Sequence, residues 1–226
     1  MFQKILDNQN PFWQFMSKMF DLAILNILWL LLSLPVFTVG ATTTGLFAAC
    51  FEMIRDQGAG PLKTFWKSMK INFRQATGLW LVCLAVSGLL IFDLWYFTAA
   101  QNDLPQAAAT AFVWISALLL IVTLMTFIMA FALLSLFDNT VKQTLSNALI
   151  LVLRHPLRAI PTLVVNAGIV FLSIYSLLHF PMLSVALTLF CAGIAVFFNA
   201  LLLFPLFQSS LPEDTLCEEE SEDTEV

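Results

Sequence analysis

Side chains that commonly carry enzyme chemistry are few in this sequence, and their spacing fits no familiar catalytic motif. The chain has no P-loop for phosphate, no GxSxG nucleophile turn, no HExxH metal-binding pair and no glycine-rich dinucleotide turn. We therefore predict no catalytic residues and no enzymatic activity.

Cysteine and histidine, the usual ligands of a structural metal, are scattered along the chain. No CxxC pair occurs among the four cysteines, which are Cys50, Cys83, Cys191 and Cys217. His155 and His179 lie at opposite ends of one predicted helix. This pattern is typical of small apolar thiols and not of a disulfide framework or a zinc site. We predict no metal and no cofactor.

The composition is that of a membrane protein. Of the 226 residues, 60% are hydrophobic and 11% are charged, and the mean hydropathy is +0.88. A soluble domain has roughly 45 to 50% apolar and about 25% charged residues. Several apolar stretches exceed the ~20 residues that cross a hydrocarbon core as a helix. The sequence predicts an all-α polytopic helical bundle embedded in the lipid bilayer. We expect no nucleic acid among its partners.

A single transmembrane domain is predicted over residues 1–208. Its five long spans are expected at about 18–37, 76–98, 107–137, 159–178 and 181–207.

The first span is interrupted by LPVFTVGATTTGLFA at residues 34–48. Proline ends a helix, glycine permits a turn and threonine caps a new helix start, so we expect the chain to reverse into a short helix at 42–55. That helix is only ~21 Å long, less than the ~30 Å core. A returning span would give six crossings and a cytoplasmic N-terminus; a re-entrant helix would give five and an outside N-terminus. We favour six, because Glu52, Arg55 and Asp56 mark an arrival at the cytoplasmic face.

Small residues recur at four-residue spacing along this short helix, at Ala41, Gly45 and Ala49. Packing drives helix association in lipid, and small side chains let two backbones approach closely. The stripe is therefore a candidate helix-packing surface.

Eight of the ten lysines and arginines lie in two segments, 55–74 and 138–158, whereas the links at 99–106 and 179–181 have no base. Because basic loops remain cytoplasmic, both segments are predicted to face the cytoplasm. The last residues, 209–226, carry eight acids and no base. Such a segment buries too little apolar area to fold, so we predict an acidic, disordered cytoplasmic tail.

Each basic segment contains an amphipathic helix, predicted at 61–74 and 139–155, and each is expected to run on into the following span. Their candidate contact residues are Lys63, Lys67, Lys70, Arg74, Lys142 and Arg154. One interpretation is an interfacial helix whose bases reach lipid headgroups. The other is a docking surface for a cytoplasmic partner.

Polar side chains inside the spans are few. Asn26, Asn166 and Asn199 are candidates for hydrogen bonds between helices, or for a polar solute site if the three share one cavity. Glu52 and Arg55, three residues apart, are expected to pair locally.

The motifs LPVFTVGATTTGLFA, FWKSMKINFRQATGLWL and NALILVLRHP resemble the YesL family of bacterial membrane proteins, a domain of unknown function. The resemblance implies a multi-pass protein of the bacterial plasma membrane, with a non-catalytic accessory or scaffold role in carbohydrate ABC import. The chain lacks the EAA-type loop of importer permeases. An independent small-solute transporter is the alternative, and a membrane enzyme acting on lipid-linked substrates is a weaker one.

Overall fold

The computed structural model of the protein describes residues 11–55, 60–99, 105–137, 140–179 and 181–208. Within these ranges every regular element is helical and there is no strand, so the all-α prediction is confirmed. The predicted acidic tail at 209–226 lies outside the described residues.

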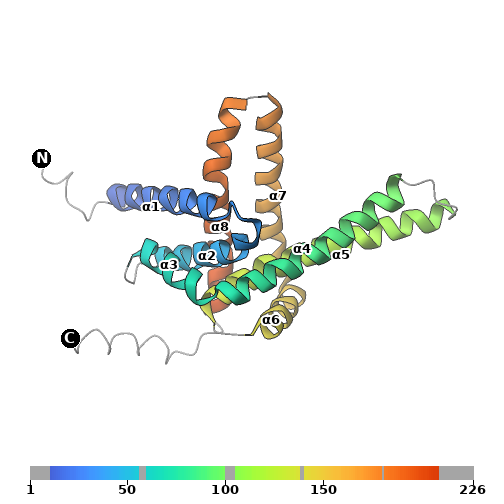
Figure 1. Ribbon diagram of the computed structural model, residues 1–226, viewed down its shortest axis with the longest axis horizontal. Coiled ribbons are helices and arrows are strands. Elements are labelled where there is room, and N and C mark those ends of the chain that lie inside the picture. The colour runs from blue at the N-terminus through green and yellow to red at the C-terminus, as the bar shows by residue number, and fades with distance from the viewer. Residues whose placement is uncertain (1–10, 56–59, 100–104, 138–139, 180, 209–226) are drawn as a thin grey trace, which may run out of the picture.

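The described residues form eight α-helices and one short 3-10 turn (Figure 1). In chain order they are α1 (Pro11–Leu32), the 3-10 turn η1 (Val36–Thr38), α2 (Val39–Arg55), α3 (Pro61–Ile71), α4 (Phe73–Ala99), α5 (Gln106–Leu136), α6 (Val141–Arg154), α7 (Pro156–His179) and α8 (Pro181–Gln208).

Four helical segments of the described chain are long and apolar enough to cross a membrane. They are Val36–Arg55, Phe73–Thr98, Gln106–Leu136 and Ala159–His179. A shorter apolar stretch, Ala192–Phe207, lies in α8. These segments are compatible with a protein embedded in a membrane.

Helix α2 lies at the centre of the bundle. It packs against α1, α3, α4, α5 and α8, and 67% of its most apolar window is buried, against 11% for the windows of α4 and α7. Its buried residues are Gly40, Ala41, Thr42, Thr44, Gly45, Leu46, Phe47, Ala48, Ala49, Cys50, Phe51 and Met53. Protein and not lipid therefore surrounds most of α2.

The chain reverses between α1 and α2, but α1 ends at Leu32 and not at the predicted residue 37. Pro35 explains the early end, because it has no backbone N–H and disfavours a helical conformation at the residue before it. Hydrogen bonds connect the two sides of the turn. Trp29 Nε1 donates to Thr43 Oγ1 at 3.1 Å, and the hydroxyls of Ser33 and Thr42 lie 2.8 Å apart. Helix α2 therefore runs back alongside α1.

The threonines of the turn do not cap α2, contrary to our expectation. The helix begins at Val39, ahead of the predicted residue 42. The hydroxyl of Thr42 donates to the carbonyl of Thr38 at 3.1 Å, and that of Thr44 donates to the carbonyl of Gly40 at 3.0 Å. Both hydroxyls thus bond to the preceding turn of the same helix, as threonines inside helices commonly do.

Two glycines of α2 face neighbouring helices at close range. A Cβ at Gly45 would lie 2.9 Å from the carbonyl oxygen of Phe65 in α3. A Cβ at Gly40 would meet the carbonyl oxygen of Ala76 in α4 and lie 2.7 Å from Trp80 Cβ. Only glycine permits these approaches without a shift of backbone. The two glycines therefore let α3 and α4 pack closely against α2.

Helix α3 does not continue into the membrane helix that follows it, which corrects the prediction of one helix over 61–74. The chain breaks at Asn72, where φ is −90° and ψ is 4°. The Asn72 N–H closes the last turn of α3 by donating to Ser68 O at 3.0 Å, and Asn72 O accepts the Ala76 N–H of α4 at 2.8 Å. In Figure 1, α3 lies beside α2, whereas α4 leaves in another direction.

Helix α6 occupies the corresponding place after α5. A capping box at its start joins Thr140 and Gln143, the Thr140 N–H donating to Gln143 Oε1 at 3.2 Å. Helix α6 packs mainly on α5, the helix before it, as α3 packs mainly on α2. Each amphipathic helix is thus fixed to the preceding helix and meets the following one only near the junction.

Two helical hairpins, α4–α5 and α7–α8, extend away from α2 in different directions (Figure 1). Large apolar side chains are exposed along both, among them Leu89, Trp114, Phe171 and Leu178. A contiguous apolar surface of this extent is unfavourable in water, whereas hydrocarbon would cover it without loss.

The close contact at Gly40 predicts a position-specific effect of one methyl group. Gly40→Ala should lower the free energy of unfolding by about 1 to 3 kcal/mol, because the new Cβ collides with the α4 backbone. Gly88→Ala is the matched control, since a Cβ at Gly88 of α4 meets nothing within 4 Å. Thermal unfolding in detergent measures both. Equal melting temperatures for the two variants would contradict the close α2–α4 contact.

Candidate functional site

The basic side chains of α3, α6 and the start of α4 form the candidate site. We call them the basic surface: Lys63, Lys67, Lys70, Arg74, Lys142 and Arg154. All six are exposed, and none forms an ion pair with a residue that the structure describes. Arg74 belongs to the first turn of α4, beyond the break at Asn72. The basic surface therefore consists of side chains from α3 and α6, which pack on the bundle, and of Arg74 from α4.

Helix α3 is held against the bundle by the side opposite its lysines. Phe65 is fully buried and Ser68 nearly so, whereas Lys63, Lys67 and Lys70 point away from the core. The Lys70 ammonium lies 6.0 Å from the centroid of the Trp66 ring, within the range of a cation–π contact. The exposed side thus combines positive charge with a partly exposed aromatic ring.

The N-terminus of α3 is tied to α2 by a carboxylate. Gly60, the residue before the helix, has φ of 106°, a conformation that favours glycine. Its N–H donates to Glu52 Oε1 at 2.8 Å. The negative carboxylate also lies at the positive end of the α3 dipole, which is favourable. Glu52 therefore sets where α3 starts.

The expected pairing of Glu52 with Arg55 is not found. Arg55 instead places its guanidinium carbon 6.0 Å from the ring centroid of Phe204 in α8. The pairing prediction rested on sequence spacing alone, and the tertiary partners of both side chains come from α3 and α8. The Gly60-Pro61 pair marks a helix start in the sequence, but nothing in the sequence connects that start with Glu52, eight residues earlier.

Helix α6 has three distinct sides. Thr144, Ala148 and Val152 are buried against the bundle. Leu149, Ile150 and Leu153 are exposed and apolar. Lys142 and Arg154 are exposed near its two ends. A helix with an exposed apolar side between two bases is suited to the membrane interface or to a protein partner.

The small-residue stripe faces the interior of the bundle. Ala41 and Ala49 are fully buried, and Gly45 lies against Phe65 and Met69 of α3. The stripe thus packs inside the bundle, where it supports α3, and is not on the surface that a partner would contact.

The three intramembrane asparagines have different surroundings. Asn26 is 1% exposed, and its Oδ1 accepts the backbone N–H of Gly193 in α8 at 2.8 Å. Asn166 Nδ2 donates to Thr162 O of its own helix at 2.6 Å. Asn199 is 1% exposed and its Oδ1 has no hydrogen-bond partner among the described residues. No hydrogen bond joins any two of the three in the described chain.

No cluster of metal ligands accompanies these groups. In the part of the chain that the structure describes, no three His, Cys, Asp or Glu side chains are placed to hold a metal ion. Cys50 and Cys83 are buried free thiols. The charged groups that the described residues do expose together are the bases of the basic surface.

The bond from Asn26 to Gly193 predicts an asymmetry between two asparagines. Asn26→Ala should destabilise the protein by about 0.6 kcal/mol and by no more than about 1.7 kcal/mol, the average and the maximum for hydrogen bonds between membrane helices. Asn166→Ala should change stability by less than about 0.5 kcal/mol, because its bond lies within α7. Unfolding of both variants in mixed micelles tests this. A larger loss at Asn166 than at Asn26 would contradict the assignment.

Residues 22–94 match the model of a family described as "Protein of unknown function, DUF624". The YesL family is a DUF624 family, so the resemblance seen in the sequence is confirmed over this segment. The matched residues include the end of α1, all of α2 and α3, and most of α4. No curated protein and no solved structure matches the chain.

Proposed function

We propose that this chain is a non-catalytic accessory or scaffold component of the bacterial plasma membrane, associated with carbohydrate ABC import. The observation that carries the scaffold role is the basic surface, six exposed bases without ion-pair partners in the described chain. The association with an importer rests on the YesL resemblance alone.

The fixed positions of α3 and α6 on the bundle favour the docking of a protein partner. A surface that is ordered before binding loses less conformational entropy when a partner arrives. Helix α3 is ordered by Glu52 at its start and by Gly45 along its length, and α6 is ordered by its capping box. The expected partner surface is acidic, and the association should weaken as salt screens the exposed charges.

We propose that α3, α6 and the acidic tail at 209–226 face the cytoplasm, because basic segments of membrane proteins remain on that side. Helix α2 runs back alongside α1, so residues 11 and 55 would lie on the same side of the membrane. This supports the six-crossing arrangement over the five-crossing one, which needs them on opposite sides.

An independent small-solute transporter is the second candidate. It is favoured by two asparagine side-chain atoms that are buried without a hydrogen-bond partner in the described chain, Nδ2 of Asn26 and Oδ1 of Asn199. Unpaired polar atoms in a membrane protein interior are unfavourable, so a polar solute or water would stabilise them. Uptake of sugar by liposomes that contain the purified protein and no ATPase would favour this candidate.

Affinity purification in mild detergent, followed by mass spectrometry, tests the scaffold role. Importer subunits should accompany the wild-type protein in stoichiometric yield. Lys63→Gln/Lys67→Gln should weaken the association about 5- to 30-fold, from about 0.5 to 1 kcal/mol for each exposed charge. Absence of importer subunits from the wild-type sample would contradict the proposal.

A matched control separates the basic surface from net charge. Gln106→Glu/Thr110→Glu has the same spacing and the same charge change, on exposed positions at the start of α5. It should leave the yield of importer subunits unchanged. An equal loss in both double variants would mean that total charge and not α3 governs the association.

A further inference from the structure

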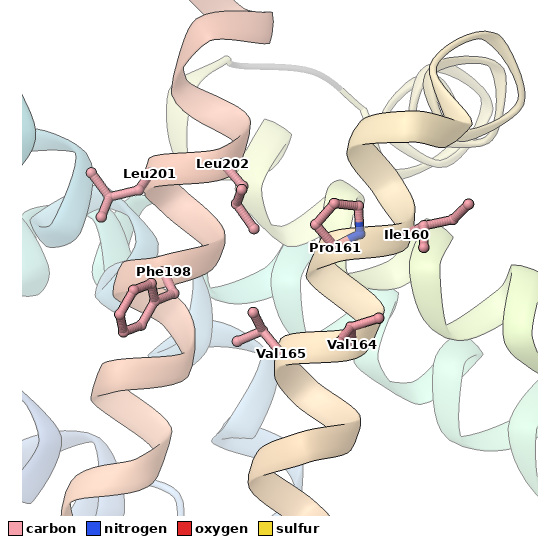
Figure 2. Close-up of a pocket in the computed structure, with 7 residues that line it drawn as sticks. All are labelled: Ile160, Pro161, Val164, Val165, Phe198, Leu201 and Leu202. Carbon is pink, nitrogen blue, oxygen red and sulfur yellow. The ribbon is translucent and has the colours of Figure 1, made fainter.

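An apolar groove runs between α7 and α8 (Figure 2). Its walls come from Pro161, Val164 and Val165 of α7 and from Phe198, Leu201 and Leu202 of α8. Figure 2 shows Pro161, Val165 and Leu202 directed toward the space between the two helices. Its volume is about 640 Å³, within the ~300 to 1,000 Å³ typical of small-molecule sites.

The groove opens to the outer surface of the bundle. Val164 is 62% exposed and Phe198 is 50% exposed, so the groove is not closed by a neighbouring helix of the described chain. No polar side chain lines it. Because α7 contains a segment apolar enough to span a membrane, the medium beside this surface is expected to be hydrocarbon.

One end of the groove lies close to a positive group. Ile160 and Pro161 are four and five residues after Pro156, the first residue of α7, or about 6 to 8 Å along the helix. Immediately before Pro156 lie Arg154 and His155, which are both exposed and have no ion-pair partner in the described chain. Helix α6, which ends at Arg154, meets this end of α7 in Figure 1.

We propose that the groove and the α6–α7 junction together bind an anionic phospholipid. The phosphate would be held at Arg154 and His155, where the guanidinium offers a charged fork of donors and the imidazole a further N–H. One acyl chain would lie in the groove, passing Pro161 and reaching Val165 about 13 Å from the start of α7. That depth is less than half of the ~30 Å core, as expected for a lipid of the leaflet that contains the basic end.

The charge at one end favours a lipid over a second copy of the chain. An acyl chain of any phospholipid could fill the groove. An exposed base near the membrane surface adds a preference for an anionic headgroup of about fivefold in affinity. A second copy would need an acidic side chain close to an apolar helix face. The exposed large side chains of α7, such as Phe171 and Leu178, have no acid among them.

Native mass spectrometry of the intact protein with added phosphatidylglycerol or phosphatidylcholine tests the proposal. The wild-type protein should retain phosphatidylglycerol at least about fivefold more strongly than phosphatidylcholine. Arg154→Gln should remove that preference and leave retention of phosphatidylcholine unchanged. Val165→Trp, which fills the groove, should reduce retention of both lipids.

Lys142→Gln is the matched control, because Lys142 is an exposed base on the same helix as Arg154 but near its opposite end. It should keep the preference for phosphatidylglycerol. Equal retention of the two lipids by the wild-type protein, or an equal loss in Lys142→Gln and Arg154→Gln, would overturn the site. A dimer that Val165→Trp dissociates would show that a second copy occupies the groove.

Discussion

Close contact between helix backbones at α2 is the constraint on which the rest of the structure depends. Gly40 lies against the backbone of α4 and Gly45 against that of α3. In a bilayer, helices gain little by hiding apolar surface from lipid, so tight packing must supply the association. Because α2 is buried on most sides, the positions of its five helical neighbours are fixed relative to one another. The basic surface takes its position from this arrangement.

The helices and their amphipathic sides could be predicted because each depends on local pattern. Long apolar runs predicted α4, α5 and α7, and the lysines at 63, 67 and 70 indicated which side of α3 is exposed. The ends of α1 and α3 could not be placed as well. Pro35 ends α1 through its effect on the preceding residues, and the break at Asn72 has no proline or glycine to signal it.

Side-chain partners could not be read from helical spacing, because they come from other elements of the structure. Asn26 bonds to Gly193 across 167 positions. Glu52 and Arg55 were close enough to pair, yet Glu52 accepts the N–H that begins α3 and Arg55 lies over Phe204. The groove between α7 and α8 was also not predictable, since its walls meet only when the two helices form a hairpin.

The accessibility of two neighbouring cysteines would show whether α3 packs on the bundle with its lysines toward the cytoplasm. Lys67→Cys and Ser68→Cys would each be placed in a chain without its native cysteines and treated with a membrane-impermeant thiol reagent on inside-out and right-side-out vesicles. Lys67 is exposed and Ser68 is buried against the bundle. This arrangement predicts rapid labelling at Lys67→Cys only in inside-out vesicles, and labelling at Ser68→Cys at least roughly tenfold slower. Equal rates at the two positions, or labelling of Lys67→Cys from the outside, would contradict it.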